Sequence, residues 1–416
     1  MKALGVRLSV MMFLEFFIWS GWFVTLGTFL EAAYHATGAQ SALAFSTQGW
    51  GAIIAPFVIG LIADRYFNAE RILALLHLVG AILMYCMYRA HSFDAFYPYV
   101  LGYMIAYMPT LALVNSISFR HLASPAAQFP RIRVWGTIGW IIAGLVISFA
   151  FGWDAPAAAA HGALGNTFLM CAIASLLLAV FSLTLPKTPP AVRSGGGAPL
   201  RELLGVDALQ LLKERNFLVF FVASILICIP LGFYYQNASP FLTEIGVHNA
   251  TAKLTIGQMS EVVLILLLPF FLLRLGIKWT LLLGMGAWVV RYGLFAIDNT
   301  GSSLPLLLVA IALHGICYDF FFVSGQIYTD AKAAIAIRSS AQGLITLATY
   351  GVGMLIGFWV AGQVADHYVV AGGHDWRGIW TVPAVLAAII MLFFAAAFRS
   401  ESLRAHLLQE SGADGR

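Results

Sequence analysis

The sequence predicts an all-α membrane protein with twelve transmembrane helices in two six-helix bundles. Of its 416 residues, 61% are hydrophobic and only 10% are charged, whereas soluble domains have about 25% charged residues. The mean hydropathy is +0.86. Apolar runs recur along the chain, each long enough to cross a hydrocarbon layer of roughly 30 Å as a helix. The net charge of +4 is spread over the whole length, so we expect no nucleic-acid partner.

Counting these runs gives the expected helices. They lie near residues 8–30, 41–63, 72–90, 96–117, 132–152, 165–185, 216–238, 253–274, 278–297, 303–326, 338–363 and 378–398.

A long polar connection follows the sixth expected helix and divides the chain. It contains Pro189-Pro190 and the glycines 195–197, which indicate a flexible linker. Its part from Leu200 to Leu212 is expected to form an amphipathic helix on the membrane surface. The predicted domains are listed by residue number: 1–186 for the N-terminal bundle, 187–215 for a cytoplasmic linker, 216–400 for the C-terminal bundle and 401–416 for a cytoplasmic tail.

The basic residues predict the orientation. With the N-terminus inside, nearly all Lys and Arg side chains fall in cytoplasmic loops, and only Arg89, Lys253 and Arg377 fall on the opposite side. Loops rich in Lys and Arg stay in the cytoplasm, so both termini are expected there.

The two halves of the chain have similar residues at corresponding positions. Pro56-Phe57 in the second expected helix matches Pro269-Phe270 in the eighth, and Tyr107 in the fourth matches Tyr318 in the tenth. Such matches favour two parallel six-helix repeats, an arrangement in which a substrate binds near the middle of the membrane.

The stretch GLIADRYFNAER, from Gly60 to Arg71, lies in the loop after the second expected helix. Gly60 permits close helix contact, and the charges of Asp64 and Arg65 can pair with neighbouring groups. We interpret these three residues as a gating latch, and the alternative is an ordinary charged turn.

One expected spanning helix, residues 255–274 (TIGQMSEVVLILLLPFFLLR), contains an acidic residue. Glu261 lies about a third of the way along it, with Gln258 one turn earlier on the same face. A carboxylate facing lipid costs several kcal/mol, so Glu261 is expected to face protein or water and to be functional.

Four other expected helices carry polar or aromatic side chains at membrane depth. These are Glu15, Trp19 and Trp22 in the first; Arg133, Thr137 and Trp140 in the fifth; Tyr234, Tyr235, Gln236 and Asn237 in the seventh; and His314, Tyr318, Asp319 and Gln326 in the tenth.

Acids, amides and aromatic rings together favour a small polar ligand with a flat ring, because aromatic faces stack on the ring while amides and carboxylates bind its hydroxyls. Some of these residues also have purely structural interpretations. Arg133 can extend to the cytoplasmic surface, Trp19 and Trp22 can pack, and His314 can be a core histidine. Arg291 in the ninth expected helix is a possible partner for the acids.

Seven stretches resemble the bacterial nucleoside:proton symporters, or nucleoside permeases, of the major facilitator superfamily. They are FFIWSGWFVTLGTFL, GLIADR, AYMPTLALVNSISF, FPRIRVWGTIGW, QMSEVVLILLLPFFLLRLGIK, YDFFFVSGQIY and IRSSAQGL. GLIADR is common to the superfamily, and the likeness runs from the first helix to the twelfth.

The resemblance implies the major facilitator fold and nucleoside uptake coupled to inward proton flow. It places Arg133, Thr137, Gln258, Glu261, Tyr318 and Asp319 near the substrate. Three positions depart from the best-known pattern. A glutamine is expected where the chain has Gly232, an asparagine where it has Tyr235, and a tyrosine where it has His314.

The expected function is therefore proton-coupled nucleoside uptake by alternating access. The substrate-binding residues are expected to include Trp140, Tyr235, Gln236, Asn237 and His314 besides those that the resemblance places there. Asp319, Glu15 and Glu261 are the candidates for proton coupling, because protonating a buried acid removes the charge that makes reorientation costly.

The alternatives are a proton-coupled sugar or oligosaccharide symporter, a drug:proton antiporter with a more apolar cavity, and a nucleoside receptor that does not transport. The sequence has no phosphate-binding loop and no metal-ligand spacing, so we expect no enzyme, no metal and no cofactor besides the proton. Its four cysteines lie in apolar runs and are expected to be packing thiols. The protein is expected to be a monomer in the lipid bilayer of the bacterial inner membrane.

Overall fold

The computed structural model describes residues 2–58, 67–122, 125–189, 206–334 and 337–400. The predicted latch residues Gly60, Asp64 and Arg65 lie outside this part of the chain, as does the first half of the predicted amphipathic helix. The described remainder of that helix is a 3-10 helix, η4.

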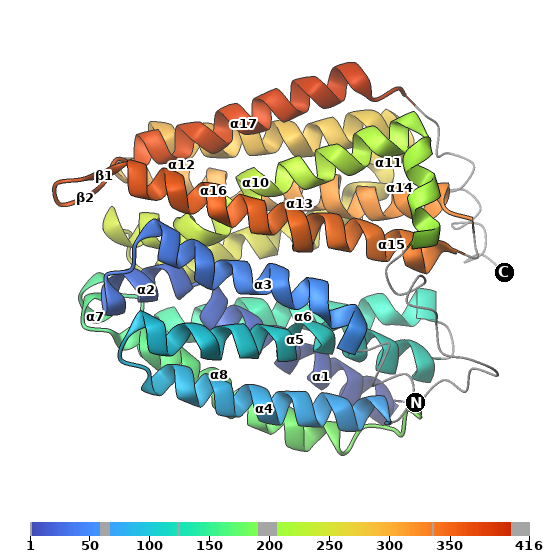
Figure 1. Ribbon diagram of the computed structural model, residues 1–416, viewed down its shortest axis with the longest axis horizontal. Helices are drawn as coiled ribbons and strands as arrows, with labels where there is room; N and C mark the ends of the chain where they lie inside the picture. The colour runs from blue at the N-terminus through green and yellow to red at the C-terminus, as the bar shows by residue number, and fades with distance from the viewer. Residues whose placement is uncertain (1, 59–66, 123–124, 190–205, 335–336, 401–416) are drawn as a thin grey trace. The chain divides into compact units, whose positions relative to one another are not determined.

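The chain folds into two compact units. The first contains Met1–Pro199 and Tyr235–Thr255, and the second contains Leu200–Tyr234 and Ile256–Arg416. Helices α10 and α11 therefore contribute to both units (Figure 1).

The first unit contains the N-terminal helices. They are α1 (Lys2–Phe23), α2 (Leu26–Tyr34), α3 (Gly38–Val58), α4 (Ala69–Arg89), α5 (Phe93–His121), α6 (Pro125–Leu145), η2 (Val146–Phe151), α7 (Pro156–Ala160), η3 (Ala163–Gly165) and α8 (Asn166–Ser182). Within this unit α1 packs along α6 and α8, while α4 packs along α5 and α8 (Figure 1).

The second unit contains most of the remaining elements. They are η4 (Val206–Lys213), α10 (Arg215–Glu244), α11 (Ala250–Ile297), α12 (Leu304–Ala312), α13 (His314–Tyr318), η5 (Asp319–Val323), α14 (Ser324–Lys332), α15 (Arg338–Thr346), η7 (Leu347–Gly353), α16 (Met354–His367), β1 (Val369–Val370), β2 (Gly373–His374) and α17 (Trp376–Ala397). The antiparallel pair β1–β2 was not predicted, and positive φ angles at Gly372 and Gly373 make its turn possible.

The described residues contain ten helical stretches that are long and apolar enough to cross a membrane. One of them, α11, spans the two expected helices 253–274 and 278–297. Gly276, with a φ of 73° and a ψ of 171°, interrupts the helix between them. The remaining expected helix, 41–63, corresponds to α3 in its described part. Within the described part of the chain, helical structure is therefore found at each of the twelve expected positions.

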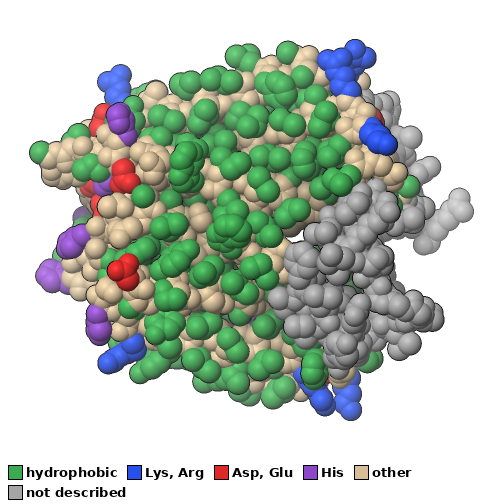
Figure 2. Space-filling view, in the orientation of Figure 1, with side chains coloured by type: hydrophobic (Ala, Val, Ile, Leu, Met, Phe, Trp, Pro, Cys, Tyr) green, Lys and Arg blue, Asp and Glu red, His purple; other side chains and the backbone are tan. Residues whose placement is uncertain are grey.

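The outer surface fits this assignment. In Figure 2 hydrophobic side chains cover most of the face in view, whereas Lys, Arg, Asp, Glu and His side chains gather near the helix ends. Exposed apolar residues such as Leu266, Ile297 and Phe149 are suited to contact with lipid tails.

Glycines bring helices into close contact in both units. In the first, a Cβ atom at Gly139 of α6 would overlap the Phe13 carbonyl oxygen of α1. In the second, a Cβ atom at Gly357 of α16 would lie 2.5 Å from the Cys228 carbonyl oxygen of α10. Lipid tails are as apolar as the side chains that they contact, so such close packing is a main source of helix association in a membrane.

We expect Gly139→Ala to destabilise the protein by about 1–3 kcal/mol, because its methyl group forces α1 and α6 apart. The matched control is Gly293→Ala in α11, where no heavy atom lies within 4 Å of an added Cβ atom. The control should be neutral or slightly stabilising, because alanine favours a helix more than glycine does. The melting temperatures of the detergent-purified variants test this, and equal values for both variants would contradict the close crossing.

Candidate substrate and proton site

The acid Glu261 is positioned by a close contact between α11 and α13. A Cβ atom at Gly315 would lie 2.6 Å from the Glu261 backbone nitrogen and 2.7 Å from the Ser260 Oγ atom. The Ser260 hydroxyl donates to the Ala312 carbonyl at 2.6 Å and accepts from the Gly315 N–H at 3.1 Å. These contacts leave α11 no freedom to slide along α13 at the residue that precedes Glu261.

Asp319 lies near Glu261 in the same unit. It begins η5, a π-helical turn between α13 and α14, and the two carboxyl groups interact electrostatically. Asp319 is fully buried, and within the described part of the chain neither of its carboxyl oxygens has a hydrogen-bond partner. π-Helical turns are rare and occur frequently at functional sites. The structure therefore brings together the two acids that the sequence singled out in the second half.

The second unit also contains a buried cluster formed by an arginine and two aromatic rings. The Arg291 guanidinium lies 3.5 Å from the Tyr234 ring centre, and its Nη1 atom donates to the His314 Nδ1 atom at 3.0 Å. The Tyr234 and His314 rings stack at a centroid distance of 5.3 Å. No ion pair joins Arg291 to Asp319 among the described residues. The sequence suggested Arg291 as a partner for the acids inside the membrane. In the structure it contacts His314 and Tyr234 instead.

Tyr318 contacts a second π-helical turn. Its hydroxyl group hydrogen-bonds the Tyr350 hydroxyl of η7, and its ring lies 5.8 Å from that of His314. Gln258, one turn before Glu261 on α11, is buried. The second unit thus presents amide, carboxyl, phenol and imidazole groups on α11, α13 and η5.

The predicted residues of α6 lie against α1 in the first unit. The Arg133 guanidinium lies 4.0 Å from the Phe16 ring centre, and Trp140 packs edge-on against Trp19 at 5.6 Å. Thr137 lies between them along α6 and is partly exposed. The three predicted residues therefore follow one stretch of α6, held against α1 by the glycine contact at Gly139.

The two tryptophans of α1 differ in their surroundings. Trp19 is partly exposed and contacts Tyr107 and Trp140, whereas Trp22 is fully buried between Tyr103 and Phe168. Trp22 is a packing residue, which was one of the two interpretations of the sequence.

The C-terminal part of α10 carries the next predicted residues. Tyr235 packs against Phe23, and the Gln236 Nε2 atom donates to the Gly38 carbonyl at 3.3 Å. Asn237 is buried, and its Nδ2 atom has no hydrogen-bond partner in the described structure. Gly232, where the resemblance predicted a glutamine, has a different role. A Cβ atom there would lie 2.6 Å from the Gly357 carbonyl carbon, so the position is a helix contact with no room for a side chain.

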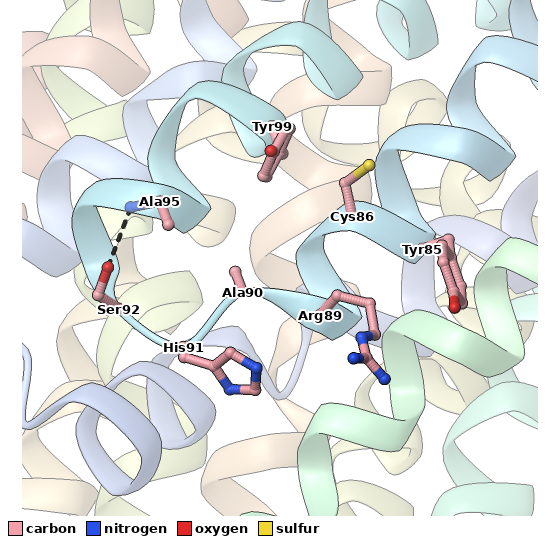
Figure 3. A pocket seen from close by; sticks show the side chains of 8 residues that line it. All are labelled: Tyr85, Cys86, Arg89, Ala90, His91, Ser92, Ala95 and Tyr99. Carbon is pink, nitrogen blue, oxygen red and sulfur yellow. Dashed lines mark hydrogen bonds between the residues drawn. The ribbon is translucent and has the colours of Figure 1, made fainter.

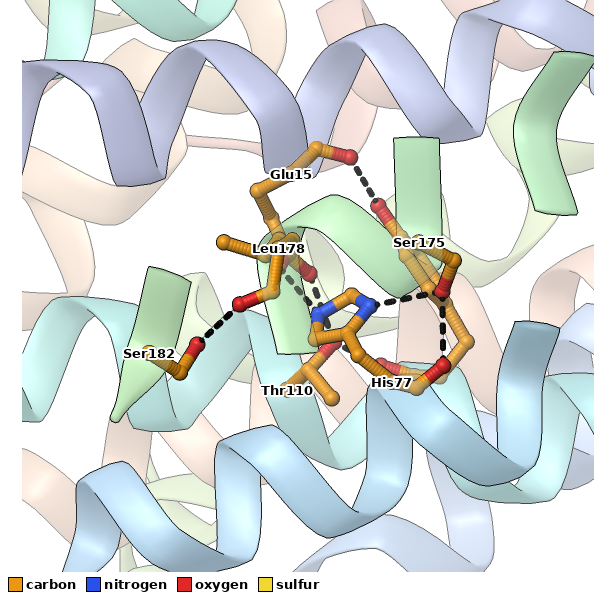
Figure 4. A network of polar contacts seen from close by, with 7 residues as sticks. Glu15, His77, Thr110, Ser175, Leu178 and Ser182 are labelled. Carbon is orange, nitrogen blue, oxygen red and sulfur yellow. Dashed lines mark hydrogen bonds and ion pairs between the residues drawn. The ribbon is translucent and has the colours of Figure 1, made fainter. Parts of the chain in front are cut away.

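Glu15 lies in a hydrogen-bonded network inside the first unit (Figure 4). Its Oε2 atom is 2.8 Å from the Nε2 atom of His77 on α4, and its Oε1 atom accepts from the Thr110 hydroxyl of α5 at 2.5 Å. The other ring nitrogen of His77 is 3.1 Å from the Ser175 Oγ atom of α8. Sequence analysis missed His77, although a single histidine inside the apolar run of a spanning helix was a usable signal.

A cavity of about 390 Å³ lies apart from all these residues, at the end of α4 (Figure 3). It is lined by Tyr85, Cys86, Arg89, Ala90, His91, Ser92, Ala95 and Tyr99. None of the predicted site residues lines it, so it gives no support to any of the predicted roles.

Comparison with known proteins gives matches along nearly the whole chain. A family model described as Nucleoside H+ symporter matches residues 1–402. A protein of Escherichia coli (strain K12) described as putative nucleoside transporter YegT is 42% identical over 404 residues, covering 94% of this chain and 93% of that one. The xanthosine permease of the same organism is 36% identical, covering 95% and 96%. The crystal structure of the nucleoside transporter NupG superposes with a TM-score of 0.85 at 31% identity, covering 96% of this chain and 100% of that one.

Proposed function

The chain belongs to the Nucleoside H+ symporter family, and from this premise we propose that it takes up nucleosides together with protons by alternating access. The observation that carries the proposal is the pair of acids in the second unit. Glu261 is held at a close helix contact, and Asp319 is buried without a hydrogen-bond partner among the described residues. A buried acid that nothing satisfies is costly in a membrane unless a ligand or a proton satisfies it.

The residues proposed to bind substrate carry groups that suit the two parts of a nucleoside. Glu261 and Gln258 on α11 offer acceptors and donors for ribose hydroxyls. Tyr318 and the partly exposed Trp140 offer aromatic faces on which a base can stack. Arg133 and Thr137 add donors for the carbonyl groups of a base. Tyr235, Gln236, Asn237 and His314 complete the proposed set with a further ring, two amides and an imidazole.

The coupling proton is assigned first to Asp319. Its carboxyl group is buried near that of Glu261, and two negative charges so close in a dry interior repel each other. Binding one proton to Asp319 removes that repulsion and takes away one of the two negative charges that reorientation would otherwise have to move. Glu261 then remains available to bind the substrate.

The apolar surface and the family place the protein in a membrane that it crosses many times. We assign it to the cytoplasmic membrane of a bacterium, with both termini inside, because the basic residues gather on that side of the predicted helices. Gating by the loop that contains Gly60, Asp64 and Arg65 remains part of the proposal.

We expect Glu261→Gln to weaken nucleoside binding roughly ten- to a hundredfold, because a charge-assisted hydrogen bond in a dry site contributes about 1.5–3 kcal/mol. Titration of purified protein with uridine measures the loss. Glu214→Gln is the control, because Glu214 is an exposed acid that pairs with Lys332. Wild-type affinity and uptake in Glu261→Gln would remove Glu261 from the substrate site.

We expect Asp319→Asn to abolish uphill accumulation while leaving exchange between equal nucleoside pools nearly intact, since the amide cannot bind and release the coupling proton. Both activities are measured in proteoliposomes with labelled uridine. Asp298→Asn is the matched control. Asp298 is buried and accepts hydrogen bonds from Ser302 and Ser303, so its loss should reduce folded protein and both activities together.

Continued accumulation by Asp319→Asn with a normal pH optimum would assign the coupling proton to another group. The same vesicles separate the rival functions. A receptor would bind uridine without exchanging it, and a sugar symporter would exchange sugars and ignore nucleosides in a competition panel.

A further inference from the structure

The network around Glu15 contains groups that the proposed substrate site does not use. Glu15 and His77 are 0% and 2% exposed, and they lie on different helices. A carboxyl group and an imidazole that share a hydrogen bond of 2.8 Å in a dry interior must have a proton between them. Without that proton, two lone pairs would face each other.

The position of a second proton depends on Ser175. Its hydroxyl lies 3.1 Å from the His77 Nδ1 atom and 2.9 Å from the His77 carbonyl oxygen. A hydroxyl has one hydrogen. When it donates to the carbonyl, its oxygen can accept from a protonated Nδ1 atom. When it turns to the ring, it donates to a bare Nδ1 atom. Both protonation states of the imidazole are therefore hydrogen-bonded without any movement of the backbone.

Thr110 gives the carboxyl group a similar adaptability. Its hydroxyl is 2.5 Å from the Glu15 Oε1 atom and 2.5 Å from the Tyr107 carbonyl oxygen. The hydroxyl can donate to a charged carboxylate, or turn to the carbonyl and accept from a protonated one. The Tyr107 hydroxyl donates to the Glu15 carbonyl at 2.7 Å and so holds α5 against α1.

We propose that Glu15 and His77 form a second proton-binding site, in which the His77 Nδ1 atom takes up the proton as the Ser175 hydroxyl turns away from it. With the proton bound, His77 is an imidazolium and balances the Glu15 carboxylate, so the network is neutral. Without it, the network carries the single negative charge of Glu15. Loading this site therefore removes a net charge from the interior of the first unit.

The described groups that face this pair include few other charges. Within the first unit, α5 contributes the phenols of Tyr103 and Tyr107, which interact electrostatically with Glu15, and α8 contributes the Cys171 thiol, which interacts with both phenols. On α6, Arg133 lies over the ring of Phe16, the residue that follows Glu15 in α1. Phenols and thiols are neutral near neutral pH. Among these groups, Arg133 alone is charged near neutral pH besides the pair itself.

Ser175→Ala tests the site. Alanine removes the acceptor of the Nδ1–H group, and an imidazolium loses more from this than a neutral ring, because charge-assisted hydrogen bonds are the stronger ones. Proton binding to the ring should therefore be weaker in Ser175→Ala than in the wild type. The matched control is Ser182→Ala, since Ser182 is buried on the same helix and its hydroxyl donates only to the Leu178 carbonyl (Figure 4).

Proton binding is measured by NMR in the absence of substrate. The nitrogen resonances of the labelled histidine rings are followed as the pH of the purified protein is varied. The signal missing in His77→Gln belongs to His77. We expect it to change with pH in the wild type, to show weaker proton binding in Ser175→Ala and to stay unchanged in Ser182→Ala. A His77 signal that does not titrate, or equal behaviour of both serine variants, would overturn the proposal.

The role of this proton site in nucleoside transport rests on the proposed function and is measured in a separate experiment. In proteoliposomes, the pH at which uridine uptake is half-maximal should move to lower pH in Ser175→Ala and not in Ser182→Ala. Titration of His77 in a protein that does not transport uridine would contradict the proposed function and leave the proton site standing. An unshifted uptake profile in a transporting Ser175→Ala variant would overturn the role of the site in flux.

Discussion

A charged side chain in a hydrocarbon layer is costly, and this constraint accounts for the arrangement of the polar groups in this protein. Glu15 is hydrogen-bonded to His77 and Thr110, and Arg291 is bound by His314 and lies against Tyr234. Asp319 differs, because no described residue hydrogen-bonds its carboxyl group. Among the described residues, Glu15 and Arg291 are therefore paired within the protein, whereas the carboxyl group of Asp319 is not hydrogen-bonded.

Close helix packing determines where these groups can lie. Lipid offers no hydrophobic driving force for helix association, so glycines and small polar residues fix the contacts. Gly315 and Ser260 fix α11 against α13 beside Glu261, and Gly139 fixes α6 against α1 beside Trp140. These backbone contacts determine the positions of the neighbouring side chains that are proposed to bind substrate.

The sequence predicted the helices, because each needs only an apolar run of sufficient length. It also singled out Glu261 and Asp319, since acids inside such runs are conspicuous, and their roles in transport remain predictions. It missed His77, because the partner of a buried acid depends on which helices pack together, and that is not visible in one segment.

Gly232 and Trp22 depend on neighbouring helices in the same way. Gly232 approaches the backbone of another helix, and Trp22 is enclosed by residues from two others. The sequence left packing as one of two interpretations of Trp22 and did not predict the helix contact at Gly232. Only the neighbouring helices show that no space is left for a ligand at either position.

The central claim, that nucleoside and proton move together, is tested most directly by substrate-driven proton flow. Uridine is added outside proteoliposomes that contain a trapped pH indicator and begin with no pH gradient. Coupled uptake should acidify the interior only when uridine is present, and a protonophore should abolish the acidification. Uridine entry without any change in internal pH would show that the nucleoside moves without a proton.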